Sequence, residues 1–196
     1  SQINPHFLFN TLNMIASTAQ IEDAVATEKM ITALSRLFRY NLKSAGTVMP
    51  LERELKIIQD YMYLQKMRFG QRVRYDTDCA PETLDVLVPS FVLQPLVENA
   101  VLHGVDGAEH GEIWVRAREQ DGKLQIQVLD NGRGLPTELL GPYARRDREL
   151  SRGHLGLYNV VSILIKYYGE GFGLYLENRT DGPGAVVTAT LPIRRE

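Results

Sequence analysis

Apolar residues in the first third of the chain recur with the period of an α-helix. Three segments show this period, and their apolar stripes are Leu8, Leu12, Ile15 and Ala19, then Met30, Leu34, Leu37 and Phe38, then Leu51, Leu55, Ile58, Met62 and Phe69. Residues 44–50 separate the second segment from the third. A weaker break near residues 20–22 precedes a new helix, for which Asp23 is a candidate cap. A lone helical hairpin cannot bury such wide faces. We therefore expect residues 1–70 to dimerise as a four-helix bundle.

From about residue 72 the pattern changes to a mixture of strands and helices. Residues 72–79 predict a strand, and a helix is predicted to begin near Pro89 or Ser90. Residues 112–130 form two alternating runs around Asp121 and Gly122, a strong hairpin signal. A helix ending at Gly169 and a second strand pair around an Asp-Gly turn at residues 181–182 complete the series. The whole chain is thus predicted to be α+β, with a two-layer α/β sandwich over residues 71–196.

Composition excludes several classes of protein. Hydrophobic residues make up 44% of the 196 residues and charged residues 23%, as in folded globular proteins. The 22 Lys and Arg against 24 Asp and Glu argue against a general nucleic-acid binder. Cys79 is the single cysteine, so a disulfide framework or cysteine metal site is excluded and a reducing compartment fits. The sequence has no apolar run of about 18 residues, and it starts without Met inside a structured motif, so we interpret it as a fragment.

Candidate chemistry is concentrated in three segments of the second half. Each segment alone has an ordinary explanation, as a helix surface, a turn or a helix start. Their order along the chain is what makes them informative. The segments are "QPLVENAVLHG" with Glu98, Asn99 and His103, "LDNGRGLP" with Asp130, Gly132 and Gly134, and "GHLGLYNV" with Gly153 and Gly156.

The order and spacing of these segments resemble the GHKL (Bergerat) ATP-binding domain shared by sensor histidine kinases, Hsp90, DNA gyrase B and MutL. The resemblance covers roughly residues 72–192 and implies ATP and Mg²⁺ as cofactors. It implies Asn99 as the Mg²⁺ ligand, and an amide oxygen suits a hard cation. It implies Asp130 as the acceptor for the exocyclic amine of adenine. Glu98 becomes a candidate for positioning water or assisting proton transfer.

The glycine-rich segments are implied to contact the nucleotide through backbone. Gly132 and Gly134 would let the chain approach the base, and the second glycine box with the following helix N-terminus would offer N–H groups to phosphate. This box contains Gly153, His154, Gly156 and Leu157, and His103 and His154 are further candidates for phosphate contact. Residues 133–152 would be the mobile lid over ATP, with no single arginine assigned. His154 stands in place of the first glycine of the box, and Ala185 stands where the family usually has Thr.

The first half resembles a different region of the same kinases. "INPHFLFNTLN", "LSRLFRYNL" and "LERELKIIQDYMYLQKMRFG" resemble the dimerisation and phosphoacceptor region of LytS/YesM-type bacterial sensor histidine kinases, which extends the resemblance to essentially the whole chain. The resemblance implies that His6 accepts the γ-phosphoryl group. Phe7 stands where many histidine kinases carry an acid, so the general base is open, with Glu98 a candidate.

Helical geometry places His6 independently of the resemblance. His6, Asn10, Asn13 and Ser17 form a polar stripe opposite the apolar one. Asn4 and Pro5 suit the N-cap and first helical positions, where the positive helix end favours the neutral, nucleophilic imidazole. If the helix instead continues upstream, Pro5 kinks it. Asn10 lies one turn on, within reach of the imidazole or a phosphoryl group.

These features predict the catalytic core of a two-component sensor kinase. We expect a homodimer that phosphorylates His6 with Mg-ATP and then an aspartate of a response regulator. We expect it to be the cytoplasmic part of a membrane sensor whose N-terminal region is missing here. Three alternatives stay open: a phosphatase-biased member in which Asn10 orients water, a degenerate signalling scaffold, and an ATPase of the chaperone or mismatch-repair kind. Whether phosphorylation occurs within or between subunits also stays open.

Overall fold

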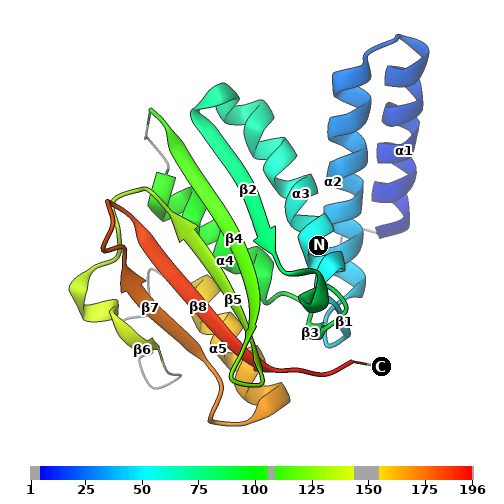
Figure 1. Cartoon of the computed structure of the whole chain (residues 1–196). Coiled ribbons are helices and arrows are strands. Elements are labelled where there is room, and N and C mark those ends of the chain that lie inside the picture. Colours follow the sequence, from blue (N-terminus) through cyan, green and yellow to red (C-terminus); the bar gives the residue numbers. More distant parts are fainter. Residues whose placement is uncertain (1–4, 106–108, 144–154, 196) are drawn as a thin grey trace.

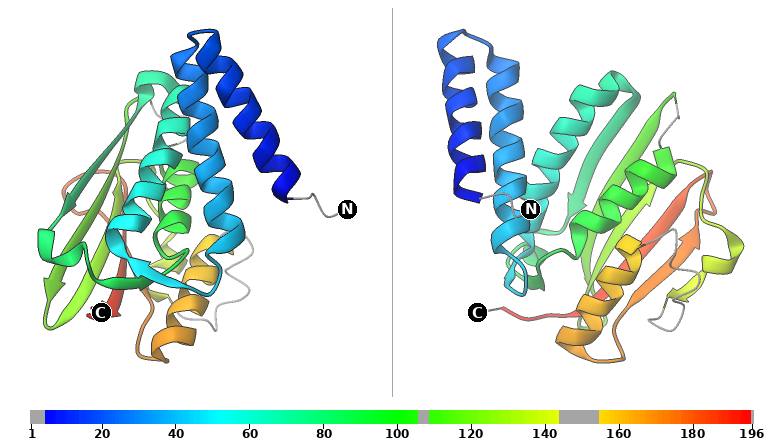
Figure 2. Two further views of the ribbon diagram at one scale, coloured as in Figure 1. Left: turned by 90° about the vertical axis from the view of Figure 1, so that its right-hand side faces the viewer. Right: turned by 180° about the vertical axis from the view of Figure 1, so that it is seen from behind.

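The chain folds into a helical hairpin that lies beside a sheet covered on one face by helices (Figure 1). This computed structural model describes residues 5–105, 109–143 and 155–195. In the hairpin, α1 (Pro5–Ile21) and α2 (Val25–Lys43) pack against each other, and α2 lies between α1 and α3 (Leu51–Phe69) in both Figure 1 and Figure 2. None of the described helices has the length and apolar character that crossing a bilayer requires.

The hairpin leaves part of its predicted apolar stripe uncovered. Leu12 and Ala19 are buried, as the helical pattern predicts, whereas Ile15 is 42% exposed. Other apolar side chains of the hairpin are also exposed, among them Phe7, Met14, Ile21, Val25 and Leu42. The single chain therefore does not bury all the apolar surface of α1 and α2.

The third predicted helix packs with the second half of the chain as well as with α2. The buried side of α3 (Leu51, Leu55, Ile58 and Met62) belongs to the same apolar core as α4 (Leu93–Asn99) and the main sheet. Just before α3, β1 (Val48–Pro50) pairs antiparallel with β3 (Leu87–Pro89). The division of the chain at residues 70 and 71 stays a prediction, and α3 contacts both sides of it.

A six-stranded mixed sheet, counted over the described residues, forms the outer layer. Its order is β2-β4-β5-β8-β7-β6, with β2 and β4 parallel and the other described neighbours antiparallel. α3, α4 and α5 cover one face of this sheet, which confirms the predicted two-layer sandwich (Figures 1 and 2). The remaining bounds are β2 Val73–Cys79, β4 Gly111–Gln120, β5 Lys123–Asp130, β6 Gly141–Tyr143, β7 Leu174–Asn178, β8 Ala185–Pro192 and α5 Leu155–Tyr168, with 3₁₀ turns at Gly70–Arg72, Pro81–Thr83 and Thr137–Leu139.

A predicted hairpin turn and a predicted helix end are both confirmed. Asp121 and Gly122 join β4 to β5 with φ of 52° and 69°, the two positive values that a type I′ turn requires. Gly169 follows α5 with φ of 91° and ends that helix, as the sequence indicates.

The predicted start of the helix near Pro89 or Ser90 is wrong. Pro89 ends β3, and Phe91 has a φ of 66°, which a right-handed helix cannot include. The helix begins only at Leu93. The short strands β1, β3 and β6 were not predicted either, because three residues carry too little alternation to be recognised.

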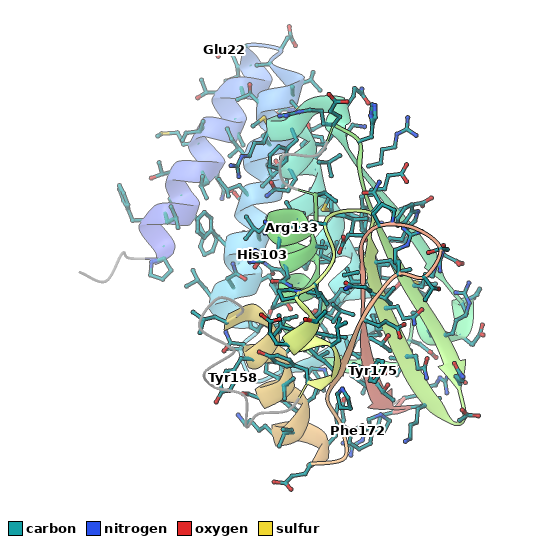
Figure 3. All side chains as sticks on the ribbon, turned by 90° about the vertical axis from the view of Figure 1, so that its left-hand side faces the viewer. Glu22, His103, Arg133, Tyr158, Phe172 and Tyr175 are labelled. Carbon is teal, nitrogen blue, oxygen red and sulfur yellow. The ribbon has the colours of Figure 1, made fainter. Side chains whose placement is uncertain are left out.

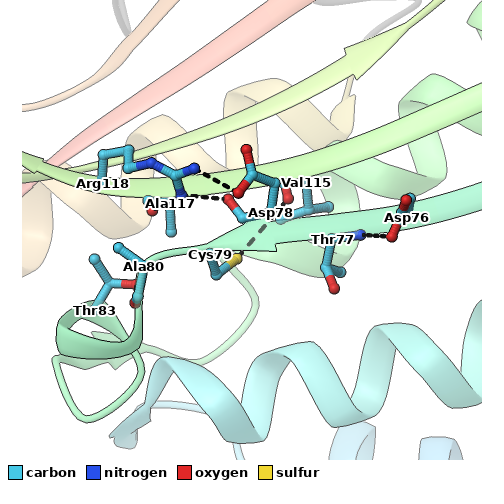
Figure 4. A network of polar contacts seen from close by, with 9 residues as sticks. All are labelled: Asp76, Thr77, Asp78, Cys79, Ala80, Thr83, Val115, Ala117 and Arg118. Carbon is cyan, nitrogen blue, oxygen red and sulfur yellow. Dashed lines mark hydrogen bonds and ion pairs between the residues drawn. The ribbon is translucent and has the colours of Figure 1, made fainter.

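A side-chain network fixes the end of the edge strand β2 against β4 (Figure 4). Arg118 of β4 donates to the Asp78 carboxylate at 2.5 Å and to the Asp78 carbonyl at 2.6 Å. Cys79 lies half-buried beside them, with its Sγ 3.9 Å from the carbonyl oxygen of Val115. Burial raises the pKa of the Cys79 thiol, so it stays protonated and has a packing role.

Candidate functional site

The helix α4 carries two of the predicted site residues at its C-terminal end. Glu98 and Asn99 are both half-buried, and Glu98 accepts a hydrogen bond from the Gln94 side chain at 2.7 Å, one turn earlier. The chain then continues as a π-helical turn over Ala100–Val105. π-helical turns are rare in proteins, and those that occur are often at functional sites. This one places His103 and Gly104 beside the end of β5.

Four of the predicted residues line one small cavity. Asn99, His103, Asp130 and Gly134 come from α4, the π-helical turn, β5 and the loop after β5. The cavity measures about 20 Å³, room for about one water molecule. The rest of its lining is Leu96, Ala100, Gly104, Val128, Leu135, Ala185 and Val187.

Asp130 is the buried acid of this cavity. It is 6% exposed, and its Oδ1 accepts bonds from the backbone N–H groups of Gly132 at 2.8 Å and Ala185 at 3.4 Å. Burial raises the pKa of Asp130, and these two hydrogen bonds oppose the rise. Both backbone bonds end on Oδ1, so Oδ2 is the acceptor left for a donor in the cavity. A buried carboxylate with a spare acceptor suits recognition of an amine.

Glycines pack the backbone tightly around this acid. A Cβ placed on Gly132 would lie 1.7 Å from the carbonyl oxygen of Gly104, and one on Gly104 would lie 2.7 Å from Cγ of Asp130. The sequence predicts a role for Gly132, whereas the role of Gly104 is apparent only in the structure. The available signal was a glycine directly after His103 inside an otherwise helical stretch. Gly132 thus serves close packing of two backbone segments beside the cavity.

Asn178 at the end of β7 is a second residue that the sequence analysis missed. Its Oδ1 accepts from the Leu135 N–H at 2.6 Å, and its Nδ2 donates to the Leu135 carbonyl at 3.0 Å. Gly134 has a φ of 76°, and a Cβ there would lie 2.7 Å from the Asn178 amide oxygen. Asn178 therefore fixes the segment that forms one wall of the cavity.

Arg133 ties the same loop to the π-helical turn. Its Nε donates to the His103 carbonyl at 2.7 Å, and the two labelled residues lie side by side in Figure 3. Arg133 begins the segment predicted to be a lid. Residues 144–152 of that segment lie outside the described residues, so the lid stays a prediction.

The predicted phosphate-binding segment is described only in part. Gly153 and His154 lie outside the described residues. Gly156 is in the first turn of α5, close enough to Pro95 of α4 that a Cβ would meet it at 3.5 Å. Leu157 is fully buried in the core, so only its backbone is available for a ligand. Contact of this segment with phosphate stays a prediction.

His6 and Asn10 lie elsewhere, on the exposed side of α1. The Asn10 Nδ2 is 3.3 Å from Nδ1 of His6, one helical turn away. Asn13 and Ser17 are exposed on the same helix, in agreement with the polar stripe expected from the sequence. His6 and Asn10 are not among the residues that line the cavity around Asp130. The predicted site residues therefore lie in two separate centres, the cavity around Asp130 and the exposed side of α1.

A larger groove of the described residues carries none of the predicted site residues. It measures about 500 Å³ and lies between α3 and the strands β2 and β4. Its charged residues, Lys66, Arg74, Asp76 and Glu112, are of both signs. We assign the site to the smaller cavity because a buried carboxylate, an amide and close-packed glycines converge there.

Known proteins resemble both halves of the chain. Residues 1–73 match the family model "Histidine kinase", and residues 86–195 match "Histidine kinase-, DNA gyrase B-, and HSP90-like ATPase". The sensor protein LytS of Oceanobacillus iheyensis is 35% identical over 99% of this chain and 34% of its own length. The sensor histidine kinase YpdA of Escherichia coli is 34% identical over 100% of this chain and 34% of its own length. The chain thus spans about a third of these relatives.

Solved structures agree on the fold. The catalytic domain of the histidine kinase ThkA gives a TM-score of 0.55 at 21% identity, covering 76% of this chain and 98% of that one. The histidine kinase domain of a blue-light activated kinase from Erythrobacter litoralis gives 0.53 at 20% identity, covering 93% and 85%.

Proposed function

The chain belongs to the sensor histidine kinases of the LytS/YesM type, and from this premise we propose that it transfers the γ-phosphoryl group of ATP to His6 and then to an aspartate of a response regulator. The observation that supports this most is one chain carrying both a buried acid in a glycine-packed cavity and an exposed histidine on a helical hairpin. An ATPase of the chaperone or mismatch-repair kind would leave the second centre without a role.

The cavity residues fit an adenine nucleotide. Oδ2 of Asp130 would accept from the exocyclic amine, because Oδ1 is already engaged by Gly132 and Ala185. The cavity of about 20 Å³ is smaller than adenine, so its lining must separate for the base to enter. Ala185 contributes its backbone N–H to Asp130. The departure from the usual Thr at this position keeps this backbone bond and removes only the hydroxyl that Thr would offer.

The cavity residues also fit a Mg²⁺ ion that is bound at the same time as a nucleotide. Among the described residues there is no cluster of three or more His, Cys, Asp or Glu that could hold a metal alone. Asn99 lines the cavity and offers a neutral amide oxygen, so the remaining ligands would be phosphate oxygens and water. When bound, the ion neutralises charge on the phosphates.

The chemistry at His6 is assigned to its ring nitrogens. For Nε2 to form the bond to phosphorus it must hold the free lone pair, so the imidazole proton is on Nδ1, and Nδ1–H would donate to the Asn10 amide oxygen once the amide that lies 3.3 Å away is turned over. The bond from the γ-phosphorus to the ADP oxygen breaks, and the imidazole proton leaves to a base. Glu98 stays a candidate for that base, and positioning with charge neutralisation supplies most of the catalysis in phosphoryl transfer.

We place a second copy of the chain on the hairpin. Phe7 of α1 is 68% exposed, and Met14, Ile21 and Leu42 add to the uncovered apolar surface. A dimeric four-helix bundle would bury these side chains. Because the relatives are described as sensor proteins of about three times this length, we also propose that the chain is the cytoplasmic part of a membrane sensor.

Incubation with γ-labelled ATP and Mg²⁺ tests this function. We expect acid-labile, base-stable label on the wild-type chain and none on His6→Gln. His110→Gln is the matched control, because His110 is exposed in a loop outside both centres. Asp130→Asn should lose nucleotide binding and label together. Label retained in His6→Gln contradicts the assignment, and absence of nucleotide binding by the wild-type chain favours the scaffold.

A further inference from the structure

A buried tyrosine of the hairpin reaches the beginning of α4. Tyr40, on α2, is 6% exposed, and its hydroxyl donates to Oε1 of Glu54 on α3, which is 1% exposed. The same hydroxyl accepts from the Phe91 N–H at 2.6 Å. One phenol oxygen thus connects α2, α3 and the segment that leads into α4.

Glu54 makes the second connection. Its Oε2 accepts from the N–H of Leu93 at 3.2 Å, and Leu93 is the first residue of α4. The first N–H groups of a helix have no partner inside it, and a carboxylate is favoured there by the helix dipole. Glu54 therefore supplies to α4 the cap that α4 does not supply itself, since its N-cap residue Val92 makes no side-chain hydrogen bond.

The segment between β3 and α4 is held in a costly conformation. Phe91 has a φ of 66°, unusual for an aromatic residue, and its ring lies 4.7 Å from the Tyr40 ring between centroids. The preceding Ser90 donates to the carbonyl of Ser44 and lies 3.0 Å from the Thr47 carbonyl, both in the loop after α2. Residues 90–93 are thus fixed to the end of α2, to the loop after it and to α3.

Asn99 and Glu98 lie at the opposite end of this helix. α4 is seven residues long, a rigid rod of roughly 10 Å at about 1.5 Å per residue. A displacement at Leu93 is therefore carried to Asn99. Asp130, by contrast, is on β5, whose place is set by the sheet.

We propose that Tyr40 and Glu54 are positioning residues: they fix α4, and with it Asn99 and Glu98, relative to the hairpin that carries His6. The proposal rests on the function proposed above. Under this proposal, recognition of the nucleotide base by Asp130 and recognition of the Mg²⁺-bound phosphates by Asn99 depend on different parts of the fold. Contacts through Asp130 are independent of the Tyr40 hydroxyl, whereas Mg²⁺-dependent contacts through Asn99 depend on it.

Tyr40→Phe tests the proposal, with Tyr75→Phe as the matched control. The Tyr75 hydroxyl is buried and has no hydrogen-bond partner among the described residues, so its removal breaks no bond. For Tyr40→Phe we expect the rate constant of autophosphorylation to fall about 10- to 100-fold, as misplacement by about 1 Å does. ADP affinity without Mg²⁺ should stay within about twofold of wild type, while the gain in affinity on adding Mg²⁺ is lost. Tyr75→Phe should match wild type in all three measurements.

Amide hydrogen exchange of the protein without nucleotide gives a further measurement. The amides of Phe91 and Leu93 should exchange faster in Tyr40→Phe. If Tyr40→Phe does not fold, Glu54→Gln replaces it, because glutamine keeps the acceptor for Tyr40 and turns an NH₂ toward the Leu93 N–H. An unchanged rate constant, or equal losses of ADP affinity with and without Mg²⁺, overturns the proposal. Absence of label in the wild-type chain contradicts the proposed function instead. In that case the Mg²⁺-dependent gain in ADP affinity and the amide hydrogen exchange of Phe91 and Leu93 still test whether Tyr40 and Glu54 position α4.

Discussion

Asn178 holds both backbone polar groups of Leu135, accepting from its N–H at 2.6 Å and donating to its carbonyl at 3.0 Å. The two residues are 43 positions apart in the sequence, and the pair joins the end of β7 to the loop after β5. One amide side chain therefore fixes the wall of the cavity that contains Asp130.

Replacement of Asn178 by alanine should loosen this wall. The two lost hydrogen bonds predict a decrease of about 1–3 kcal/mol in the free energy of unfolding. Nucleotide affinity should fall as well, because Gly134 and Leu135 line the cavity. Urea unfolding and calorimetric titration with ADP measure the two effects. Gln125→Ala is the control and should change neither, because Gln125 on β5 does not line the cavity. Unchanged ADP affinity in Asn178→Ala would show that the wall is fixed by other contacts.

Gly104→Ala should displace the buried acid. The new methyl would lie 2.7 Å from Cγ of Asp130 and 2.9 Å from its Oδ1, closer than van der Waals contact allows. Overpacking of this kind costs about 1–3 kcal/mol, so we expect a lower melting temperature and weaker ADP binding. Gly171→Ala is the control, since a Cβ there meets nothing within 4 Å. Wild-type ADP affinity in Gly104→Ala would mean that the Asp130 carboxylate does not contact the nucleotide.

The sequence predicts the parts of the fold that local patterns encode. Asp121 and Gly122 mark the hairpin by their own conformational preferences, and the exposure of His6 and Asn10 follows from helical spacing. Asp130, Asn99 and Gly134 were found through a family resemblance, and the structure brings them to one cavity.

Long-range contacts escape such patterns. Gly104 matters because it packs against Gly132, and Asn178 because it bonds Leu135, and neither relationship has a local signature. The start of α4 was misplaced for the same reason. The positive φ of Phe91 is held by Tyr40, a residue 51 positions away, against the intrinsic preference of an aromatic residue.

Asn10→Ala should slow phosphorylation of His6. Loss of the contact at 3.3 Å removes one hydrogen bond from the imidazole, which at about 1 kcal/mol corresponds to roughly a fivefold lower rate. Asn13→Ala is the control, because Asn13 is exposed on the same side of α1. Single-turnover labelling with γ-labelled ATP measures the rate. An unchanged rate would contradict this role of Asn10. Slower hydrolysis of the regulator's phosphoaspartate in the presence of Asn10→Ala would support the phosphatase-biased alternative, in which Asn10 orients the hydrolytic water.

The buried carboxyl of Glu54 should make stability depend on pH. Burial raises the pKa of Glu54, and the bonds from the Tyr40 hydroxyl and the Leu93 N–H oppose this only in part. The folded chain therefore binds a proton at Glu54 more readily than the unfolded chain, where a glutamate titrates at about 4.3. The stabilisation from this proton is complete below that pH and is lost as the pH rises through the raised pKa.

Glu54→Gln removes this titration, so the mutant should gain stability relative to wild type as the pH rises above about 4.3. Burial also raises the pKa values of Asp60 and Asp130, but both acids remain in the two chains and their effects cancel in the difference. Thermal unfolding at a series of pH values between about 4 and 8 measures the difference in melting temperature. Gln59→Ala, at an exposed position of α3 with no titrating group, should give a difference that is independent of pH. A difference for Glu54→Gln that stays flat or falls with rising pH would mean that Glu54 is ionised in the folded chain throughout this range, held charged by Tyr40 and the N-terminus of α4.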